Sequence, residues 1–448
     1  MLSAFANSLR VPELRQRIFF TVGLIAICRL MASVPTPGVD AVALRELMRQ
    51  IHQSAGGSFL GLFNMFSGGA LAQCAVGSLG IMPYISASII LQLMTAVVPA
   101  LERLAREGDA GRQKITQYTR YLTVVLCVVQ GYAMAVALEN PQTFGANAAI
   151  VMIPGWGFRL LTVITLTTGT LLLMWLGEQM TERGIGNGIS LIITIGIVSQ
   201  LPGAVAATWN MFQPVDGVAQ FSIFHLIMLL AMLLVVIAGV VAMTQAQRKI
   251  PVQYAKRVVG RKVYGGQSTY MPLRVNYSGV MPIIFAQAIL MFPPQILRQI
   301  PGDIFQRIAG ALAPGALWFN IIYVLMIIFF SYFWVATQFN PIQIADDLKK
   351  NGGYVPGIRP GRPTAEYLDR AMTRITLAGS VFLAIIAVIP TMMGKMFNIP
   401  WIVYQFFGGT SLLIMVGVML DTMRQVESHL VTRYYDGFLK KGRLRGRR

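Results

Sequence analysis

The chain has 448 residues, of which 55% are hydrophobic and only 12% are charged, and its formal net charge is +19. Soluble domains usually carry about 25% charged residues, so this composition excludes a soluble globular protein and indicates an integral membrane protein. In such a protein, a large positive charge first indicates basic loops on the cytoplasmic side rather than nucleic-acid binding.

Ten apolar runs predict transmembrane helices, because a span needs about 20 mostly apolar residues. In chain order the runs are 18–34, 79–98, 118–138, 159–177, 188–206, 223–243, 275–292, 316–339, 375–392 and 402–420. They are too long and too uniformly apolar to be the alternating strands of a barrel. The predicted fold class is therefore an all-α polytopic membrane protein.

Lys and Arg residues set the predicted orientation and organisation. Most of the 37 fall on the cytoplasmic side if the N-terminus lies in the cytoplasm, which predicts that both termini are cytoplasmic. The predicted parts are a cytoplasmic arm (1–17), an N-terminal half (18–206), a C-terminal half (207–422) and a basic tail (423–448). No cleavable signal peptide is expected.

Arg29 is the clear ionisable exception within a predicted span. A charge at the bilayer centre costs about 2.5–3.5 kcal/mol on the insertion scale, and it often marks an ion path or proton relay. A structural pair, or a side chain that reaches toward the outer face, is the simpler interpretation. No carboxylate falls well inside a span, which argues against an ion-coupled carrier.

The stretch 57–92 combines a short apolar segment with an interrupted span. Residues 58–67 are apolar and aromatic but too few to cross a bilayer, and Gly68-Gly69 follows them. The next span has Gly80 and Pro83 near its start, and proline inside a helix removes a hydrogen bond and kinks it. We interpret the segment at about 57–70 as a plug and the interrupted span as one wall of a pore.

Two large cytoplasmic loops, 244–274 and 340–374, are rich in Lys, Arg, Tyr and Gly. Anchoring to anionic lipid is one explanation. Docking of ribosomal RNA or of a large acidic partner is the other, and it is favoured because anchors need neither length nor rigid Pro-Gly turns. The glycine-rich run 352–361 lacks the GxxxxGK[ST] pattern, so no nucleotide site is predicted. No motif predicts a catalytic site, a metal site or a cofactor.

The two halves of the chain repeat each other. GIMPYI at 80–85 matches GVMPII at 279–284, and GISLII at 188–193 matches GTSLLI at 409–414. Both matches are offset by five spans, an odd number, which gives the halves opposite topology. Inverted repeats with Gly- and Pro-interrupted helices point to a functional site where the repeats meet.

The repeat aligns Ile85 with Ile284 and Ile193 with Ile414. Ile81 and Ile189 lie one helical turn before Ile85 and Ile193, on the same faces. Four helices would thus present stiff β-branched side chains to one axis, as a narrow collar that excludes water and ions. Ordinary packing of a common membrane residue is the alternative.

At these motifs the chain resembles the SecY family, the central subunits of bacterial protein-conducting channels. The most specific stretches are FNMFSGGAL (63–71), GIMPYISASII (80–90), QYTRY (117–121), MWLGEQMTERGIGNGIS (174–190), YAKRVVGRKVY (254–264), QSTYMPLRVN (267–276), VPGIRPG (355–361) and FGGTSLL (407–413). The resemblance implies ten helices in two inverted pseudo-symmetric halves around a central pore with a plug helix. It implies a channel, not an enzyme, that translocates unfolded secretory polypeptides and releases transmembrane segments laterally into lipid.

The resemblance also implies roles for individual residues. The pore ring would be Ile81, Ile85, Ile189, Ile193, Ile284 and Ile414. The plug would contain Phe59, Leu60, Leu62, Phe63, Asn64, Met65 and Phe66. The lateral gate would include Pro83, Gln92, Asn276 and Pro282. SecA or the ribosome would dock on Lys256, Arg257, Arg261, Lys262 and Arg359.

The implied partners are SecE-like and SecG-like subunits, the SecA ATPase, the ribosome with its RNA and proteins, preproteins that carry signal sequences, and membrane lipids. The implied location is the cytoplasmic membrane of a bacterium. The chain departs from many relatives at Thr244-Gln245, where they carry an acidic residue, and in the shorter outer segment 293–315. Two alternatives remain, a secondary transporter of a small solute and an intramembrane protease, although the spans hold no evident Ser–His or Asp–Asp pair.

Overall fold

The computed structural model describes residues 11–40, 42–44, 46, 59–140, 150–213, 221–254, 257–259, 262–264, 268–299, 302–313 and 315–441. Contacts divide the chain into two units. The first contains Met1–Ser222, Asn398–Phe406 and Val418–Arg448, and the second contains Ile223–Phe397 and Phe407–Gly417. This division is based on contacts and does not test the predicted halves 18–206 and 207–422.

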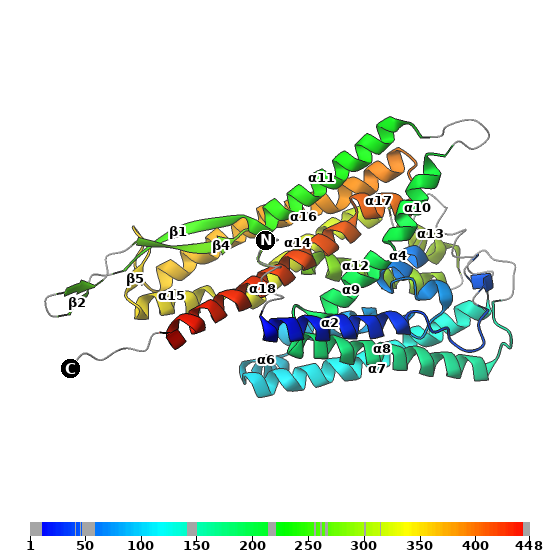
Figure 1. Ribbon diagram of the computed structural model, residues 1–448, viewed down its shortest axis with the longest axis horizontal. Helices are drawn as coiled ribbons and strands as arrows, with labels where there is room; N and C mark the ends of the chain where they lie inside the picture. Colours follow the sequence, from blue (N-terminus) through cyan, green and yellow to red (C-terminus); the bar gives the residue numbers. More distant parts are fainter. Residues whose placement is uncertain are drawn as a thin grey trace. The chain divides into compact units, whose positions relative to one another are not determined.

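The first unit is helical where it is described (Figure 1). Its elements are α2 (Pro12–Met31), α4 (Phe59–Phe66), the 3-10 turn η1 (Leu71–Gln73), α5 (Met82–Val97), α6 (Pro99–Arg106), α7 (Asp109–Glu139), α8 (Trp156–Arg183), α9 (Gly188–Ser199) and α10 (Leu201–Met211). The division between the units passes through α17 (Trp401–Phe407) and α18 (Thr410–Lys441).

The second unit combines helices with two small antiparallel sheets. Its helices are α11 (Ile223–Gln245), α12 (Met281–Gln299), α13 (Asp303–Ala311), α14 (Leu317–Gln338), α15 (Pro341–Lys350) and α16 (Arg362–Met396). Its strands are β1 (Gln247–Tyr254), β2 (Arg257–Val259), β3 (Lys262–Tyr264), β4 (Ser268–Arg274) and β5 (Gly353–Tyr354). One sheet has the order β4-β1-β5, and β2 pairs with β3 in the other.

Each of the ten predicted spans overlaps a helix. Among the described residues, seven helices are long and apolar enough to cross a membrane, or eight if the bent pair α5 and α6 is one span. Of the remaining two predicted spans, the first falls on α2, which carries charges in its first turns and Arg29 in its last, and the seventh falls on α12, whose apolar part is only Met281–Met291. The runs of apolar residues therefore located the helices correctly.

The repeated prolines do not interrupt helices, contrary to the sequence prediction. Pro83 is the second residue of α5, and Pro282 is the second residue of α12. A proline is compatible with the first turn, because the backbone N–H it lacks has no intrahelical partner there. Gly80 and Gly279 precede them in the same left-handed conformation, with φ of 59° and 61°. The chain instead bends by 99° between α5 and α6, at the end of the second predicted span.

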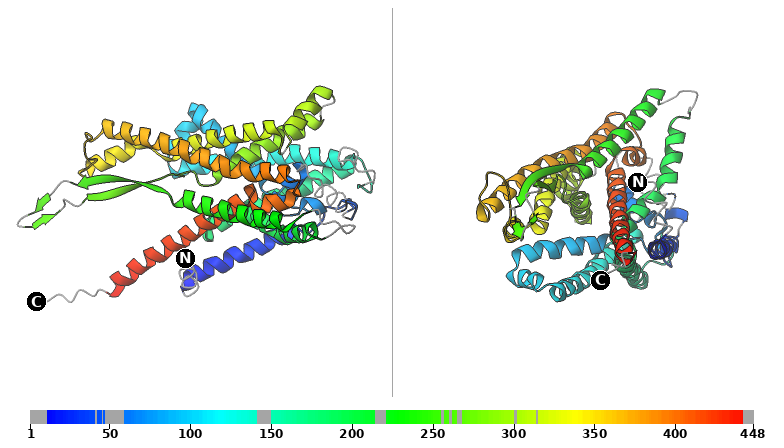
Figure 2. Two further views of the ribbon diagram at one scale, coloured as in Figure 1. Left: turned by 90° about the horizontal axis from the view of Figure 1, so that it is seen from above. Right: turned by 60° about the vertical axis from the view of Figure 1, so that its left-hand side comes forward.

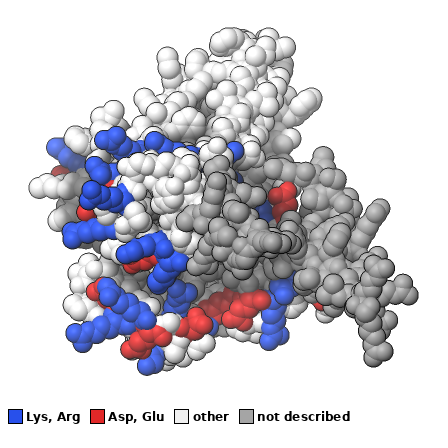
Figure 3. Space-filling model, turned by 90° about the vertical axis from the view of Figure 1, so that its left-hand side faces the viewer, with Lys and Arg blue, Asp and Glu red and all other residues white. Residues whose placement is uncertain are grey.

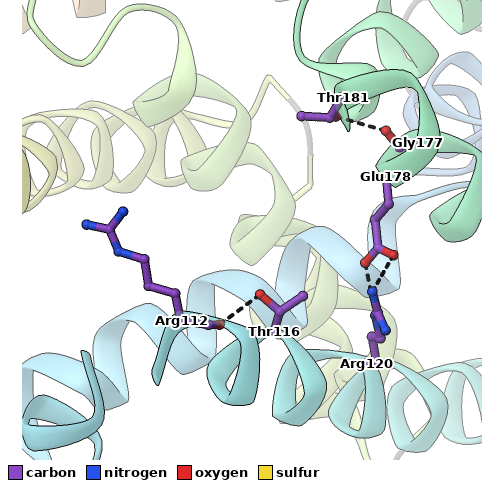
Figure 4. Close-up of polar contacts among 6 residues, drawn as sticks. All are labelled: Arg112, Thr116, Arg120, Gly177, Glu178 and Thr181. Carbon is purple, nitrogen blue, oxygen red and sulfur yellow. Dashed lines mark hydrogen bonds and ion pairs between the residues drawn. The ribbon is translucent and has the colours of Figure 1, made fainter. Parts of the chain in front are cut away.

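Helices α7 and α8 lie side by side in the first unit (Figure 2). Their contact is close at Gly131, where a Cβ would lie 3.5 Å from the Cα of Val163. Nearer one end, Arg120 on α7 donates two hydrogen bonds to the carboxylate of Glu178 on α8, at 3.1 and 2.7 Å (Figure 4). These two parallel hydrogen bonds fix the rotation of α8 relative to α7. Glu178 directly follows Gly177, a glycine that lies at the candidate pore.

Candidate pore and plug

The crossing of α8 and α9 is built around two glycines. A Cβ placed on Gly188, the first residue of α9, would lie 2.1 Å from the carbonyl oxygen of Gly177. Thr181 joins the two backbones, because its hydroxyl donates to the Gly177 carbonyl at 2.9 Å (Figure 4) and accepts from the Gly188 N–H at 2.9 Å. Asn187 caps α9 by accepting from the N–H groups of Ile189 and Ser190. The motif at 174–190 therefore brings the start of α9 against α8.

Two predicted ring residues meet at this crossing. A Cβ on Gly177 would lie 3.4 Å from Cγ1 of Ile189 and 3.6 Å from Cδ1 of Ile81. Both isoleucines thus lie against the same point of α8. Ile85 follows Ile81 by one turn, its N–H donating to the Ile81 carbonyl at 3.1 Å, and Ile193 follows Ile189 by one turn on α9 and is buried. The first unit thus carries four predicted ring residues at the starts of α5 and α9.

The second unit carries the other two predicted ring residues near the starts of two helices. Ile284 is in the first turn of α12 and Ile414 is in the first turns of α18, and both are buried. These helix starts adjoin, because a Cβ on Gly417 would lie 2.1 Å from Cγ1 of Val280. Val280 occupies the repeat position of Ile81 in the sequence. Closure of all six residues into one ring stays a prediction.

The predicted plug contains the eight-residue helix α4. Asn64 organises its end, because its backbone carbonyl accepts from the Gly69 N–H at 2.8 Å and its side-chain Oδ1 accepts from the Ala72 N–H at 2.9 Å. Phe63, Asn64, Met65 and Phe66 are all buried. The side chains of Phe59, Leu60 and Leu62 lie outside the described part of the structure.

The end of the plug segment lies against α9. A Cβ on Gly196, one turn beyond Ile193, would lie 3.0 Å from the carbonyl oxygen of Phe66. A cavity of about 30 Å³ adjoins this contact, and its lining includes Phe66, Ser67 and Ile81. Within the first unit, the plug segment and the predicted ring residues on α5 and α9 are therefore neighbours.

The predicted gate residues are held by local hydrogen bonds. Asn276 donates from Nδ2 to the Gly279 carbonyl at 2.8 Å and accepts from the Ser278 hydroxyl at 3.1 Å, which orders the turn before α12. Gln92 donates to the Ser88 hydroxyl at 3.4 Å within α5. Asn276 also lines a cavity of about 10 Å³ with Ser331, Thr376 and Ser380. Since Pro83 and Gln92 belong to one unit and Asn276 and Pro282 to the other, the gate stays a prediction.

The two basic loops share a three-stranded sheet in the second unit. Strand β1 pairs with β4 from Gln247↔Arg274 to Gln253↔Ser268, and β5 from the other loop pairs with β1 at Gln253↔Tyr354. The sheet is fixed to α14 and α16 by a core that includes Ile250, Leu273 and Leu368. The sequence predicted two large basic loops but not the pairing of β5 in one loop with β1 in the other.

The predicted docking residues are spread along this structure. Arg359 is exposed, in the turn between β5 and α16, and its carbonyl accepts from the Thr364 hydroxyl at 2.8 Å. Arg257 and Lys262 belong to β2 and β3, whose backbones alone are described, and Lys256 and Arg261 lie outside the described residues. Figure 3 views the side that lies on the left in Figure 1, and blue Lys and Arg side chains are prominent on it among red acidic ones.

Sequence reasoning named the isoleucines but missed the residues that position them. Gly177, Thr181 and Gly417 carry no pattern that distinguishes them from ordinary membrane residues. Only the motif 174–190 as a whole signalled that this crossing matters. Among the described residues, no group of three or more His, Cys, Asp or Glu side chains could hold a metal ion.

Comparison with known proteins identifies the family. The SecY family model matches residues 75–423. The protein translocase subunit SecY of Chlamydia trachomatis is 45% identical over 448 residues, which cover 98% of both chains. The structure resembles that of a protein-conducting channel, with 19% identity, a TM-score of 0.63 and coverage of 93% of this chain and 92% of the other. It also resembles canine Sec61 in a ribosome-channel complex, with 19% identity, a TM-score of 0.59 and the same coverage of both chains.

These likenesses confirm the predicted fold class, and the predicted count of ten helices is consistent with it. The helices that contain the ten apolar runs are arranged as in one established fold, while the sequence relatives carry one name at high coverage. The chain is a multi-pass membrane protein, and it belongs to the SecY family of protein translocase subunits.

Proposed function

We propose that this chain forms the protein-conducting channel of a bacterial translocase. It passes unfolded secretory polypeptides across the membrane and releases apolar segments sideways into lipid. The observation that carries the proposal is the packing of a non-spanning helix, α4, and its glycine step beside Ile81 and the helix that bears Ile193. A closed pore needs such a removable obstruction, whereas a transporter of small solutes has no use for one. The family relationship supports the same function.

The six isoleucines form the constriction of the proposed pore. Each lies in the first turns of its helix or directly before it, and the two halves of the chain contribute through matching motifs, of which the pair before α5 and α12 has the same left-handed glycine. Apolar side chains that make no hydrogen bonds can move between rotamers at little cost, so the ring can widen around a polypeptide and close afterwards. When it is narrow, it excludes water and therefore ions.

The lateral gate of the proposed channel involves the starts of α5 and α12. Pro83 and Pro282 lie in the first turns of these helices, and the polar side chains of Gln92 and Asn276 are held by local hydrogen bonds. Asn276 lines a small cavity whose lining also includes the hydroxyl-bearing residues Ser331, Thr376 and Ser380. A signal sequence that inserts between these helices would disrupt the hydrogen bonds of Gln92 and Asn276. A more hydrophobic signal sequence would gain more free energy on insertion, so the gate would respond to the hydrophobicity of the signal sequence.

Partners dock on the basic sheet and its flanking turns. The ribosome and SecA would contact the tip with Lys256, Arg257, Arg261 and Lys262, and the turn with Arg359. The shared sheet supports this, because the pairing of β5 with β1 joins the two loops. A ribosome-bound structure among the fold relatives supports ribosome docking. SecE-like and SecG-like subunits complete the complex in the cytoplasmic membrane, with both termini of this chain in the cytoplasm.

A protection assay tests this function. The chain is reconstituted in vesicles with SecE-like and SecG-like subunits, and SecA, ATP and a preprotein are added outside. We expect the preprotein to become protected from added protease only when SecA and ATP are present. Uptake of a small solute by the chain alone, with no protected preprotein, would contradict the proposal and favour the transporter alternative.

A further inference from the structure

The charge of Arg29 is directed at the plug segment. Arg29 lies in the last turn of α2 and is partly buried. Its Nη2 donates to the carbonyl oxygen of Gly68 at 3.0 Å. Among the described residues, no carboxylate forms an ion pair with Arg29. The hydrogen bond to Gly68 is therefore the specific contact that holds this guanidinium inside the membrane protein.

The same carbonyl receives a second donor from α9. The hydroxyl of Ser199 donates to the Gly68 oxygen at 3.2 Å, while the next residue, Gly69, lies beside the side chain of Gln200. Two helices of the first unit, α2 and α9, thus converge on one peptide group at the end of the plug. Because α9 also bears Ile189 and Ile193, this attachment connects the plug to the helix that carries predicted ring residues.

The backbone conformation of Gly68 and the absence of a side chain allow both donors to reach its carbonyl oxygen. Its φ is +68°, and a Cβ placed on it would lie 2.3 Å from Nη1 of Arg29 and 2.9 Å from the Cα of Gly196. The guanidinium therefore lies directly over a position that has no room for a side chain. Gly69 is also left-handed, with φ of +88°. Two consecutive left-handed glycines reverse the chain and can change conformation more freely than other residues.

We propose that Arg29 is a positioning residue that latches the plug of the channel in its closed place, through the carbonyl of Gly68. The inference rests on the proposed channel function. Movement of the plug takes Gly68 away from Arg29 and Ser199, and it leaves the guanidinium beside a cavity whose lining includes Ile25, Ile81 and Ile195. An arginine without a hydrogen-bond acceptor in apolar surroundings is unfavourable. The latch therefore opposes opening until the substrate supplies the compensating free energy.

Hydrogen exchange and ion leak test the latch in the reconstituted complex. The probes are the amides of Gly68, Gly69 and Ala72, which donate to Met65 and Asn64 within the plug segment. We expect Arg29→Met to raise their exchange rates by about tenfold, and to raise the ion conductance of vesicles without substrate. Arg29→Lys keeps a cationic donor and should retain most of the protection. Ser199→Ala removes the second donor and should give a smaller change in the same direction.

Arg159→Met is the matched control. Arg159 is also an arginine of the first unit, but it pairs with Glu139 at the junction of α7 and α8. Its loss should leave the plug amides and the leak unchanged. If Arg29→Met does not alter plug exchange or leak while the unsubstituted complex still translocates a preprotein, the latch is wrong and the channel function stands. The latch is also wrong if exchange rises equally throughout α2 and α8, since Arg29 would then support the fold in general. If the unsubstituted complex translocates nothing, the proposed function itself fails.

Discussion

Single glycines determine where the isoleucines of the candidate pore can meet. Gly188 lets α9 touch the Gly177 carbonyl, and Gly177 leaves the space in which Ile81 and Ile189 lie. In the second unit, Gly417 likewise leaves the space in which the side chain of Val280 lies. The isoleucines were predictable, because the repeat aligned them. The glycines were not predictable, because the need for a glycine becomes visible only once the neighbouring helix has been placed in the structure.

Substitution of Gly188 should be much more harmful than substitution of another glycine near the same helix pair. In Gly188→Ala, the new methyl group would overlap the Gly177 carbonyl, so α8 and α9 must separate. We expect a loss of about 1–3 kcal/mol, as for other overpacked sites, in a thermal or denaturant unfolding measurement in detergent.

Gly157→Ala is the control for this prediction. Gly157 lies in the first turn of α8, and a Cβ there would meet no atom within 4 Å. Replacement of an unstrained helical glycine by alanine stabilises by about 0.4–1 kcal/mol. Equal stabilities for the two variants would show that the α8–α9 contact is not as close as described.

At the scale of elements, hydropathy located the helices but not their ends. The run 118–138 lies inside α7, which begins at Asp109, and the run 375–392 lies inside α16, which begins at Arg362. Hydropathy marks only the apolar part of a helix, whereas polar turns beyond it are stabilised by contacts with other segments. The prolines were misread for a related reason. Pro83 follows a left-handed glycine, and only that backbone turn makes it the start of a helix instead of a kink.

The basic sheet shows a second limit of prediction from the sequence, which concerns strands and their pairing. The burial of β1 alternates, with Ile250 and Val252 inside and their neighbours outside. This period of two is visible in the sequence, but Arg248, Lys249 and Pro251 obscured it as a strand signal. The pairing of β1 with β5 joins residues about 100 positions apart, and no local pattern predicts such a contact.

Ile250→Ala should loosen the basic sheet at its attachment to α14 and α16. Ile250 is 1% exposed, and truncation of a buried isoleucine to alanine costs about 2–5 kcal/mol. Hydrogen exchange of the β1 and β4 amides should therefore rise by at least tenfold. Lys249→Ala, at the exposed neighbouring position, should change exchange by less than threefold, because exposed substitutions cost about 0.5 kcal/mol or less. Similar exchange in both variants would contradict the role of this core.

At the scale of the whole molecule, composition alone identified a membrane protein, and the repeat predicted which residues line its pore. The comparisons confirm the family and the fold class. Arg29 was interpreted as a structural pair or a side chain reaching outward, and the structure instead gives it a backbone carbonyl of the plug segment as partner. Its function depends on a contact between segments 39 residues apart, which a search for charged partners could not find.

The most direct test of the channel is crosslinking of a stalled secretory polypeptide to the ring. Single cysteines are introduced as Ile81→Cys, Ile85→Cys, Ile193→Cys, Ile284→Cys and Ile414→Cys, in a background without Cys28, Cys74 and Cys127. Val125→Cys and Leu325→Cys, at exposed positions of α7 and α14, are the controls. The account predicts disulfides between a cysteine of the stalled chain and the ring positions of both units, and none with the controls. A stalled chain that reaches none of the five ring positions, or reaches the controls equally well, would contradict it.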